Sequence, residues 1–300
     1  MLGKVTLKHA ITTAGQLGVF HAGQPGARCS LLLLHGRGTD SSSVSWHHLL
    51  DPLSEFADVR ALDLPGFGQS VDIRPVGGPR AMAEVVAEAL DDLGAGPAVI
   101  IGVSMGGDVA LNLALDSPQH VAGLVLIAPG GLVPVFRNPA LQYVAWLTAR
   151  SPEWVMHPVS RFANRFARTT LRFMVENVAA VPEEVVVRLG QESKHPQAGR
   201  AYLRYNRAVI GRRRMLNDLS ARVRAISVPT LFLHGKKDRL VDPEGSVRAS
   251  RIMPAADLRL IADCGHWAQI ERPDVFLSET QGFLACHGLL AGPASDPNGG

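Results

Sequence analysis

A series of short apolar segments, separated by stretches with helical spacing, is the feature that most constrains the fold of this chain. The segments are rich in branched apolar residues, as is typical of strands that are buried on both faces. They lie at residues 31–34, 59–64, 98–103, 122–128, 230–235 and 257–262. Between them, residues 79–94 and 105–117 repeat apolar residues at helical intervals. This alternation predicts an α/β fold with a mostly parallel sheet flanked by helices.

The alternation breaks off between residues 132 and 225, where no strong strand pattern occurs. This segment is typical of several helices, punctuated by Pro139, Pro152, Pro158, Pro182 and Pro196. It carries 16 Lys and Arg against 6 Asp and Glu, a net charge of +10, whereas the rest of the chain has 14 against 21, a net charge of −7. We therefore expect residues 1–131 and 226–290 to form one core and residues 132–225 to form an inserted, basic helical cap.

Composition and charge exclude several classes of protein. Of the 300 residues, 46% are hydrophobic and 19% are charged, which fits a globular protein with a large buried core and excludes disordered, collagen-like and coiled-coil chains. The apolar runs are far shorter than the roughly 18 residues that a membrane span requires. The net charge is only +3 and no nucleic-acid-binding motif is visible, so nucleic acid is not an expected partner. Residues 291–300 are small, polar and turn-forming, which predicts a disordered tail.

The N-terminal segment and the cysteines indicate a cytoplasmic protein. Residues 1–13 alternate polar and apolar like a strand, and they lack the apolar core and the cleavage site of a signal peptide. Cys29, Cys264 and Cys286 are too widely spaced for a disulfide framework or a zinc cluster. Histidines and carboxylates do not occur at metal-binding spacing, so we expect no metal and no cofactor. A membrane partner is likewise not expected, and a homo-oligomer remains open.

The sharpest chemical motif is Gly102-Val103-Ser104-Met105-Gly106-Gly107, which joins the strand at 98–103 to the helix at 105–117. A serine on such a tight turn needs small neighbours, because its backbone is strained and the adjoining elements pass close to it. Ser104 would project from the carboxyl end of the sheet as a candidate nucleophile. The backbone N–H of Met105, in the first turn of the helix, would point toward a negative charge forming there.

Two residues later in the chain could activate that serine. A serine hydroxyl needs a base that takes its proton, and the base needs a third group that holds its tautomer. Asp238 and His266 each follow a predicted strand, so both would lie on the same edge of the sheet as Ser104. The alternatives are a surface histidine at 266 and a helix cap at 238. Asp242 precedes Pro243 and fits a helix N-cap better than a catalytic acid.

The turn His35-Gly36-Arg37-Gly38 follows the strand at 31–34 and is the candidate for the second half of an oxyanion hole. A glycine-flanked turn lets a backbone N–H face the nucleophile, and we expect that of Arg37, with Gly38 as the second choice. The alternative is an ordinary glycine turn. His35 and His234 stand at strand ends beside glycines, where hydrogen bonding of a turn is the expected role.

These motifs together resemble those of the α/β-hydrolase superfamily. The resemblance rests on HGRG, DLPGFGQS, GVSMGG, the acid of LHGKKD and the base of CGHW, and it covers the chain outside 132–225. It implies a mostly parallel, eight-stranded sheet, Ser104 as nucleophile, His266 as base and Asp238 as orienting acid. It also implies an oxyanion hole of the Met105 and Arg37 amides. The haloalkane dehalogenase and epoxide hydrolase branches are disfavoured, because they have aspartate at the position of Ser104.

Two segments are similar to the meta-cleavage-product hydrolases, which cut carbon–carbon bonds in vinylogous keto acids. They are IAPGGL at 127–132 and CGHWAQIERPDVF at 264–276. The chain departs from that group at Val103, where asparagine is usual, and at Thr39-Asp40, where proline and glycine are usual. In that group a cap arginine grips the substrate carboxylate, and no single arginine here aligns with it. Esterase-like relatives therefore stay open.

Side chains near these motifs and in the cap suggest what the substrate is like. An apolar pocket is expected from Gly38, Phe67, Val103, Phe136, Trp146 and Trp267, although aromatic residues at helical spacing are often simply core. Arg161, Arg165, Arg168 and Arg172 recur on one helix face, which is either a solvated surface or an anion-attracting lid.

The sequence therefore predicts a serine hydrolase that acts on an ester or a carbon–carbon bond of a small, largely apolar molecule, either neutral or anionic. Ser104 would attack a carbonyl and water activated by His266 would release the acyl group. The alternatives are a ligand-binding protein that keeps the fold without catalysis, and non-hydrolytic use of it as a lyase, cyclase or cofactor-free haloperoxidase.

Overall fold

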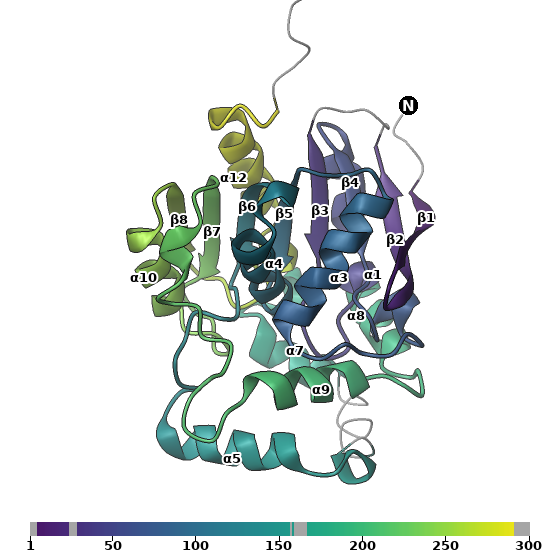
Figure 1. Ribbon diagram of the computed structural model, residues 1–300, viewed down its shortest axis with the longest axis vertical. Coiled ribbons are helices and arrows are strands. Elements are labelled where there is room, and N and C mark those ends of the chain that lie inside the picture. The colour runs from purple at the N-terminus through teal and green to yellow at the C-terminus, as the bar shows by residue number, and fades with distance from the viewer. Residues whose placement is uncertain (1–4, 24–28, 157, 159–166, 291–300) are drawn as a thin grey trace, which may run out of the picture.

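The computed structural model describes residues 5–23, 29–156, 158 and 167–290, and its centre is an eight-stranded sheet (Figure 1). The strand order is β1-β2-β4-β3-β5-β6-β7-β8. β1 and β2 pair antiparallel, as do β2 and β4, and every other neighbouring pair is parallel. The strands are β1 (Thr6–Thr12), β2 (Gly15–Ala22), β3 (Ser30–Leu34), β4 (Asp58–Leu62), β5 (Ala98–Val103), β6 (Val121–Ile127), β7 (Thr230–Gly235) and β8 (Ala256–Ile261). The mostly parallel, eight-stranded α/β fold is thereby confirmed.

The apolar segments of the sequence coincide with six of these strands, and those expected at 98–103 and 230–235 match β5 and β7. β2 did not stand out, because its sequence GQLGVFHA interrupts the apolar residues with glycine and polar side chains. It becomes a strand through pairing on both sides, with β1 and with β4. The predicted tail at 291–300 lies outside the described residues.

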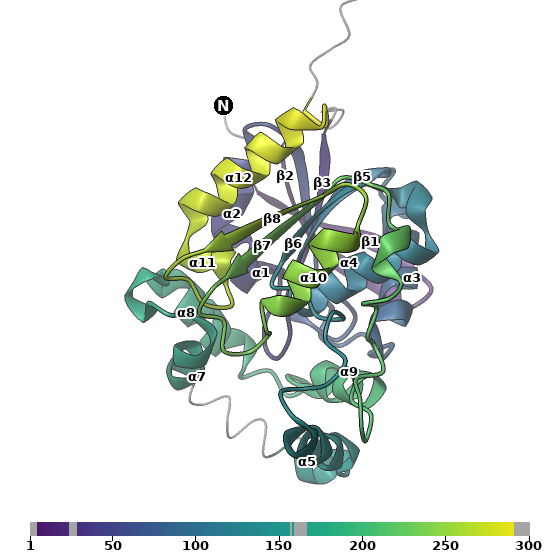
Figure 2. The ribbon, with the colours of Figure 1, turned by 90° about the vertical axis from the view of Figure 1, so that its left-hand side faces the viewer.

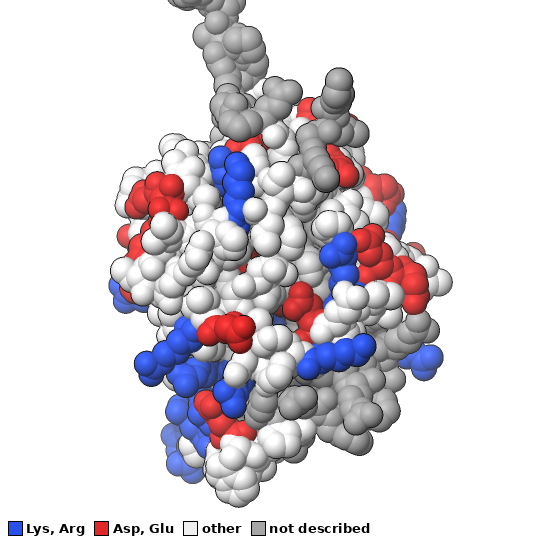
Figure 3. All heavy atoms as spheres, turned by 90° about the vertical axis from the view of Figure 1, so that its right-hand side faces the viewer, with Lys and Arg blue, Asp and Glu red and all other residues white. Residues whose placement is uncertain are grey.

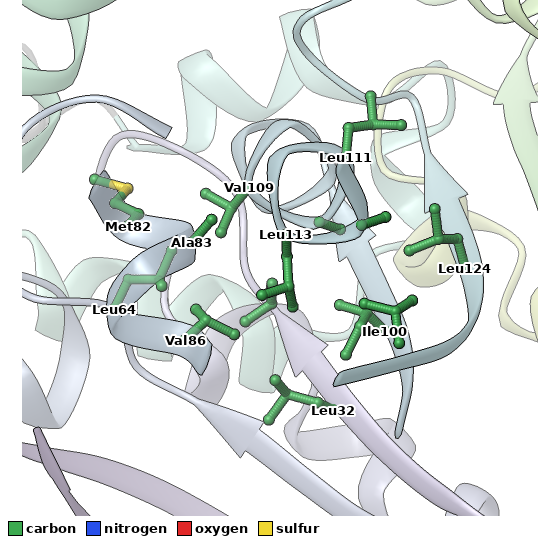
Figure 4. Packing of buried hydrophobic residues seen from close by; sticks show 14 of the residues in the cluster. Leu32, Leu64, Met82, Ala83, Val86, Ile100, Val109, Leu111, Leu113 and Leu124 are labelled. Atoms are coloured by element: carbon green, nitrogen blue, oxygen red, sulfur yellow. The ribbon is translucent and has the colours of Figure 1, made fainter. Parts of the chain in front are cut away.

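Helices cover both faces of the sheet, and successive strand residues pack against opposite layers. Leu32 and Ile100 point into a cluster shared with α3 and α4, which Figure 4 shows from close by. Leu31 and Ile101 point into a second cluster, on the side of α2 and α12. The helices of these layers are α1 (Ser42–Ser45), α2 (His47–Ser54), α3 (Pro79–Asp92), α4 (Met105–Asp116), α10 (Glu244–Ile252), α11 (Ala268–Glu271) and α12 (Pro273–Cys286).

The segment between β6 and β7 is helical in its described part and lies at one end of the sheet, at the bottom of Figures 1 and 2. Its labelled helices are α5 (Pro139–Arg150), α7 (Ala167–Met174), α8 (Glu183–Glu192) and α9 (Arg200–Val209). We call residues 132–225 the insertion. A group of Lys and Arg side chains gathers at the lower left of Figure 3, at the end of the molecule where the insertion lies.

Of the basic helix face predicted in the insertion, Arg161, Arg165 and the side chain of Arg168 lie outside the described part of the chain, whereas Arg172 is exposed on α7. Of the helices in the described part of the chain, none is long and apolar enough to span a membrane.

Candidate active site

Ser104 occupies the sharp turn between β5 and α4. Its φ of 54° lies in the left-handed region, which a residue with a side chain adopts only when its surroundings hold it there. Ser104 N donates to Ile127 O (2.9 Å), and Ser104 O accepts from Gly130 N (2.8 Å). A Cβ on Gly102 would collide with the backbone of Gly106, and one on Gly106 would collide with the backbone after β3. The glycines on either side of the serine are therefore required by close backbone approach.

Asp238 and His266 come from loops after neighbouring strands and meet in a direct hydrogen bond. His266 Nδ1 donates to Asp238 Oδ2 at 2.7 Å, and both side chains are fully buried. Asp238 Oδ1 accepts from the backbone N–H groups of Leu240 (2.7 Å) and Val241 (3.0 Å). This hydrogen bond assigns the proton to Nδ1 and leaves Nε2 of His266 as the acceptor nitrogen.

Burial and charge set the protonation of this pair. Burial disfavours the ionised form of Asp238, but His266 and His234 outweigh it and hold the pKa of that carboxyl well below its ordinary value. Burial also lowers the pKa of His266 below its ordinary 6.5; Asp238 opposes this effect, and Arg37 adds to it. At neutral pH the pair is therefore a carboxylate and a neutral imidazole, the charge states that a base and its orienting acid require.

Nε2 of His266 is buried and has no hydrogen-bond partner in the described part of the chain. The hydrogen bond from Ser104 to His266 is accordingly not formed in this structure. Hydrogen bonds of this kind are often long in unliganded enzymes and tighten when substrate binds.

The loop that carries His266 is anchored by Glu271, a residue that the sequence analysis did not single out. Glu271 is buried, and its carboxylate accepts from the N–H groups of Gly265 (2.8 Å), Glu176 (3.0 Å) and Asn177 (2.7 Å). The backbone N–H of His266 donates to Met174 O (2.6 Å). These contacts fix the loop to the insertion. The sequence feature that could have indicated this role is a carboxylate shortly after His266, on α11.

The turn after β3 is held by Asp40. This buried carboxylate accepts from Gly36 N (2.7 Å) and from the Ser45 hydroxyl (2.7 Å). The Arg37 guanidinium donates to the Tyr202 hydroxyl of α9 (2.7 Å) and lies 5.6 Å from the centre of its ring. The turn thus places a cation between the sheet edge and the insertion.

A cavity of about 710 Å³ lies between the carboxyl edge of the sheet and the insertion. The turns of the sheet contribute Arg37, Ser104, Met105, Gly130 and Asp238. The insertion contributes mostly apolar and aromatic residues, including Val133, Phe136, Ala145, Ala149, Tyr202, Leu203, Tyr205, Val209 and Met215. The mixture of an apolar wall and a few polar groups is that of a small-molecule site.

Most of the residues that were expected in the pocket do not line the cavity. Phe136 lines the cavity, whereas Phe67, Val103 and Trp267 are buried in the hydrophobic core. Gly38 and Trp146 are not among the described residues that line it, and Trp146 instead stacks on Tyr143, with ring centres 5.6 Å apart. Val103 is the last residue of β5 and packs in the same layer as Ile101, two residues earlier in the strand.

The remaining candidates have simpler roles. Asp242 lines the cavity and its Oδ1 accepts from Glu244 N (3.0 Å), but the N-cap of α10 is Pro243, one residue after the predicted cap. His35 Nε2 accepts from Leu64 N (3.1 Å) and its Nδ1 donates to Gly36 O (2.9 Å), so it holds a turn. His234 instead contacts Asp238, at 3.1 Å. Within the described ranges, no group of three or more His, Cys, Asp and Glu side chains could hold a metal ion.

Comparison with known proteins identifies what the chain is similar to. A family model described as the alpha/beta hydrolase fold matches residues 30–273. The chain is 30% identical, over 85% of its length and 86% of the relative's, to a 2-hydroxy-6-oxononadienedioate/2-hydroxy-6-oxononatrienedioate hydrolase of Burkholderia vietnamiensis. It is 28% identical, over 88% and 91% respectively, to a 2-hydroxy-6-oxo-6-phenylhexa-2,4-dienoate hydrolase of Burkholderia cepacia. A thermophilic esterase of Thermogutta terrifontis superposes with a TM-score of 0.72 at 25% identity, over 94% of this chain and 99% of that one.

Proposed function

The chain belongs to the alpha/beta hydrolase fold family, and from that premise we propose that it is a serine hydrolase whose catalytic triad is Ser104, His266 and Asp238. The observation that carries the proposal is the buried 2.7 Å hydrogen bond between His266 and Asp238, which leaves Nε2 of His266 without a hydrogen-bond partner among the described residues. Ser104 and Asp238 border the same cavity, at the carboxyl edge of the sheet. A serine hydroxyl becomes a nucleophile when such a histidine accepts its proton, so the proposal requires Nε2 of His266 to meet Ser104 Oγ when substrate binds.

The chemistry follows from these groups. Nε2 of His266 would take the Ser104 proton while Oγ bonds to the substrate carbonyl carbon, and Asp238 would stabilise the resulting imidazolium. The oxyanion would be held by the backbone N–H groups of Met105 and Arg37. The imidazolium would then protonate the leaving group, and a water deprotonated by His266 would release the acyl group from Ser104.

The cavity supports a small substrate with an apolar body and an anionic group. Its walls from the insertion, which we propose acts as a cap, are mostly apolar. Arg37 is a partly buried guanidinium that lines the cavity, and no carboxylate of the described residues lies within salt-bridge distance of it. Of the other arginines that line it, Arg239 and Arg248 are paired with Glu176 and Glu244, whereas Arg137 donates to the Arg239 carbonyl and has no carboxylate partner among the described residues. Arginines that line the same cavity as Ser104 and have no ion-pair partner among the described residues favour a substrate that brings its own negative charge.

Two kinds of bond are candidates for cleavage, a carbon–carbon bond and an ester bond. The names of the sequence relatives favour the carbon–carbon bond of a 2-hydroxy-6-oxo-dienoate, a substrate with a carboxylate and a ketone. For such a substrate His266 would first help to move the proton of the 2-hydroxyl group to C5, which turns C2 into a ketone. Ser104 would then attack the 6-oxo carbon, and the bond between C5 and C6 would break. An ester is favoured by the likeness to the Thermogutta terrifontis esterase.

A substrate panel in H₂¹⁸O separates these chemistries. Purified protein is offered 2-hydroxy-6-oxo-6-phenylhexa-2,4-dienoate and short-chain p-nitrophenyl esters, and products are analysed by mass spectrometry. We expect ¹⁸O in the carboxylic acid product and loss of turnover by a factor of about 10³ or more in Ser104→Ala. Turnover without ¹⁸O would indicate lyase or cyclase chemistry, and binding without turnover would indicate a ligand-binding protein.

A further inference from the structure

A second imidazole lies on the proposed triad acid. His234, the penultimate residue of β7, is completely buried. Its Nε2 lies 3.1 Å from Asp238 Oδ2 and 3.2 Å from the carbonyl oxygen of Val241. Its Nδ1 lies 2.8 Å from the hydroxyl of Ser246 on α10. The same Asp238 oxygen therefore faces His234 on one side and His266 on the other.

The contacts of His234 determine which of its nitrogens carries the proton. A carbonyl oxygen can only accept, so Nε2 of His234 must be the donor to Val241 O and to Asp238 Oδ2. In the neutral ring Nδ1 is then an acceptor, and the hydroxyl of Ser246 donates to it. The ring is thus held between a strand and a helix, with its N–H directed at the carboxylate.

Each oxygen of Asp238 consequently has two donors. Oδ1 accepts two backbone N–H groups, and Oδ2 accepts the N–H groups of two imidazoles. A carboxylate held at four points cannot rotate away from His266. A negative charge shared among four donors also stabilises the imidazolium of His266 less than a charge directed at His266 alone.

We propose that His234 is a positioning residue of this site, which fixes Asp238 Oδ2 against Nδ1 of His266 and restrains the basicity of His266. The inference rests on the proposed triad and deepens it. The groups that face His266 are Asp238 and His234 from β7 and its following loop, Arg37 from the turn after β3, and the Met174 carbonyl. Those that face His234 are Asp238, His266, Ser246 and the Val241 carbonyl.

The test compares His234→Leu with His234→Gln in the full-length protein. Leucine removes the donor, whereas the glutamine amide reaches to about the position of Nε2 and can still donate. For His234→Leu we expect kcat/KM to fall by as much as about 10²-fold, the scale of a 1 Å misplacement in an active site. The pKa of the acidic limb in the pH profile of kcat/KM should rise, because Asp238 Oδ2 then accepts from His266 without the competing N–H of His234. His234→Gln should recover most of the activity and the wild-type limb.

His21→Leu is the matched control. His21 is also buried and also donates to an aspartate, with Nε2 2.6 Å from Asp58 Oδ1, but that pair lies where β2 meets the start of β4. Removal of the His21 imidazole should lower the free energy of unfolding without shifting the acidic limb of the kcat/KM profile. If His234→Leu does not fold, Ser246→Ala, which removes the donor to Nδ1, should move the acidic limb in the same direction.

The outcomes separate the two proposals. Suppose that Ser104→Ala is inactive but the acidic limb is unshifted in His234→Leu, or in Ser246→Ala where His234→Leu does not fold. That result would overturn the role of His234 and leave the proposed triad standing. Full activity of Ser104→Ala would overturn the triad, and the role of His234 with it.

Discussion

At the scale of single residues, the site depends on a serine held in an unfavourable conformation. A residue with a side chain at φ 54° costs on the order of 1–3 kcal/mol, which the surrounding contacts must offset. Those contacts are the backbone hydrogen bonds of Ser104 to Ile127 and Gly130. They can form only because Gly102 and Gly106 let β5, α4 and the end of β3 approach one another closely.

Gly106→Ala should therefore disrupt this turn. The new methyl group would meet the carbonyl groups of Leu34 and His35, which cannot move without disturbing β3 and the turn after it. We expect a loss of about 1–3 kcal/mol in the free energy of unfolding, together with loss of hydrolytic activity. Urea unfolding and activity assays check this. Gly282→Ala, in α12, is the control, because a methyl group there meets nothing within 4 Å. Equal effects of the two substitutions would refute the steric account of the motif.

The protonation of His266 gives a second prediction at this scale. Burial and Arg37 hold the pKa of His266 below 6.5, and a base must be neutral to accept a proton. The rate constant kcat/KM should therefore be pH-independent near pH 7 and fall only as the pH drops below 6.5. A pH profile measured with one substrate checks this, and an acidic limb above 6.5 would contradict it.

At the scale of elements, a buried carboxylate joins the sheet layer to the insertion. Asp108, in the first turn of α4, accepts from the hydroxyl of Tyr205 on α9 (2.7 Å) and from the amide of Asn217 (2.5 Å). Burial raises the pKa of Asp108 to about 7, even though Asn217, Tyr205 and Asn112 donate to it and oppose the rise. Helix α4, which begins just after Ser104, is thereby tied to the insertion.

This carboxylate makes stability depend on pH. Below pH 3.8, the ordinary pKa, Asp108 is protonated in both folded and unfolded chains; between 3.8 and about 7 only the folded chain keeps the proton. Stability from this group should therefore be lost as the pH rises through about 7. Asp40 and Asp63 change in the same direction, so the difference between wild type and Asp108→Asn isolates Asp108. We expect a smaller decline in the free energy of unfolding for the variant; parallel curves would show that Asp108 does not titrate in this range.

At the scale of the whole molecule, the strands with a local apolar pattern could be predicted from the sequence. Features that depend on contacts between distant residues could not. Buried parallel strands are continuous apolar runs, so β5 and β7 could be located from the residues alone. Asp238 and His266 could be expected at the same edge of the sheet as Ser104, because the carboxyl ends of parallel strands meet there, and their catalytic roles stay predictions.

Other features have no local signal. β2 depends on its two neighbours, and Glu271, His234 and Asp108 act through partners that lie far away in the sequence or in another element. The residues that line the cavity were difficult to predict from the sequence for the same reason. Phe136 and Trp146 are both aromatic residues of the insertion, but Phe136 lines the cavity and Trp146 stacks on Tyr143, and no local pattern in the sequence distinguishes them.

The measurement that tests the central claim most directly is the intact mass of the protein after exposure to a fluorophosphonate, with peptide mapping of the adduct. An activated serine reacts with this probe, whereas an ordinary serine hydroxyl does not. We predict one adduct, on Ser104, absent from Ser104→Ala and strongly slowed in His266→Ala. An unmodified Ser104 in well-folded protein, or labelling that is as fast in His266→Ala as in the wild type, would contradict the proposed triad.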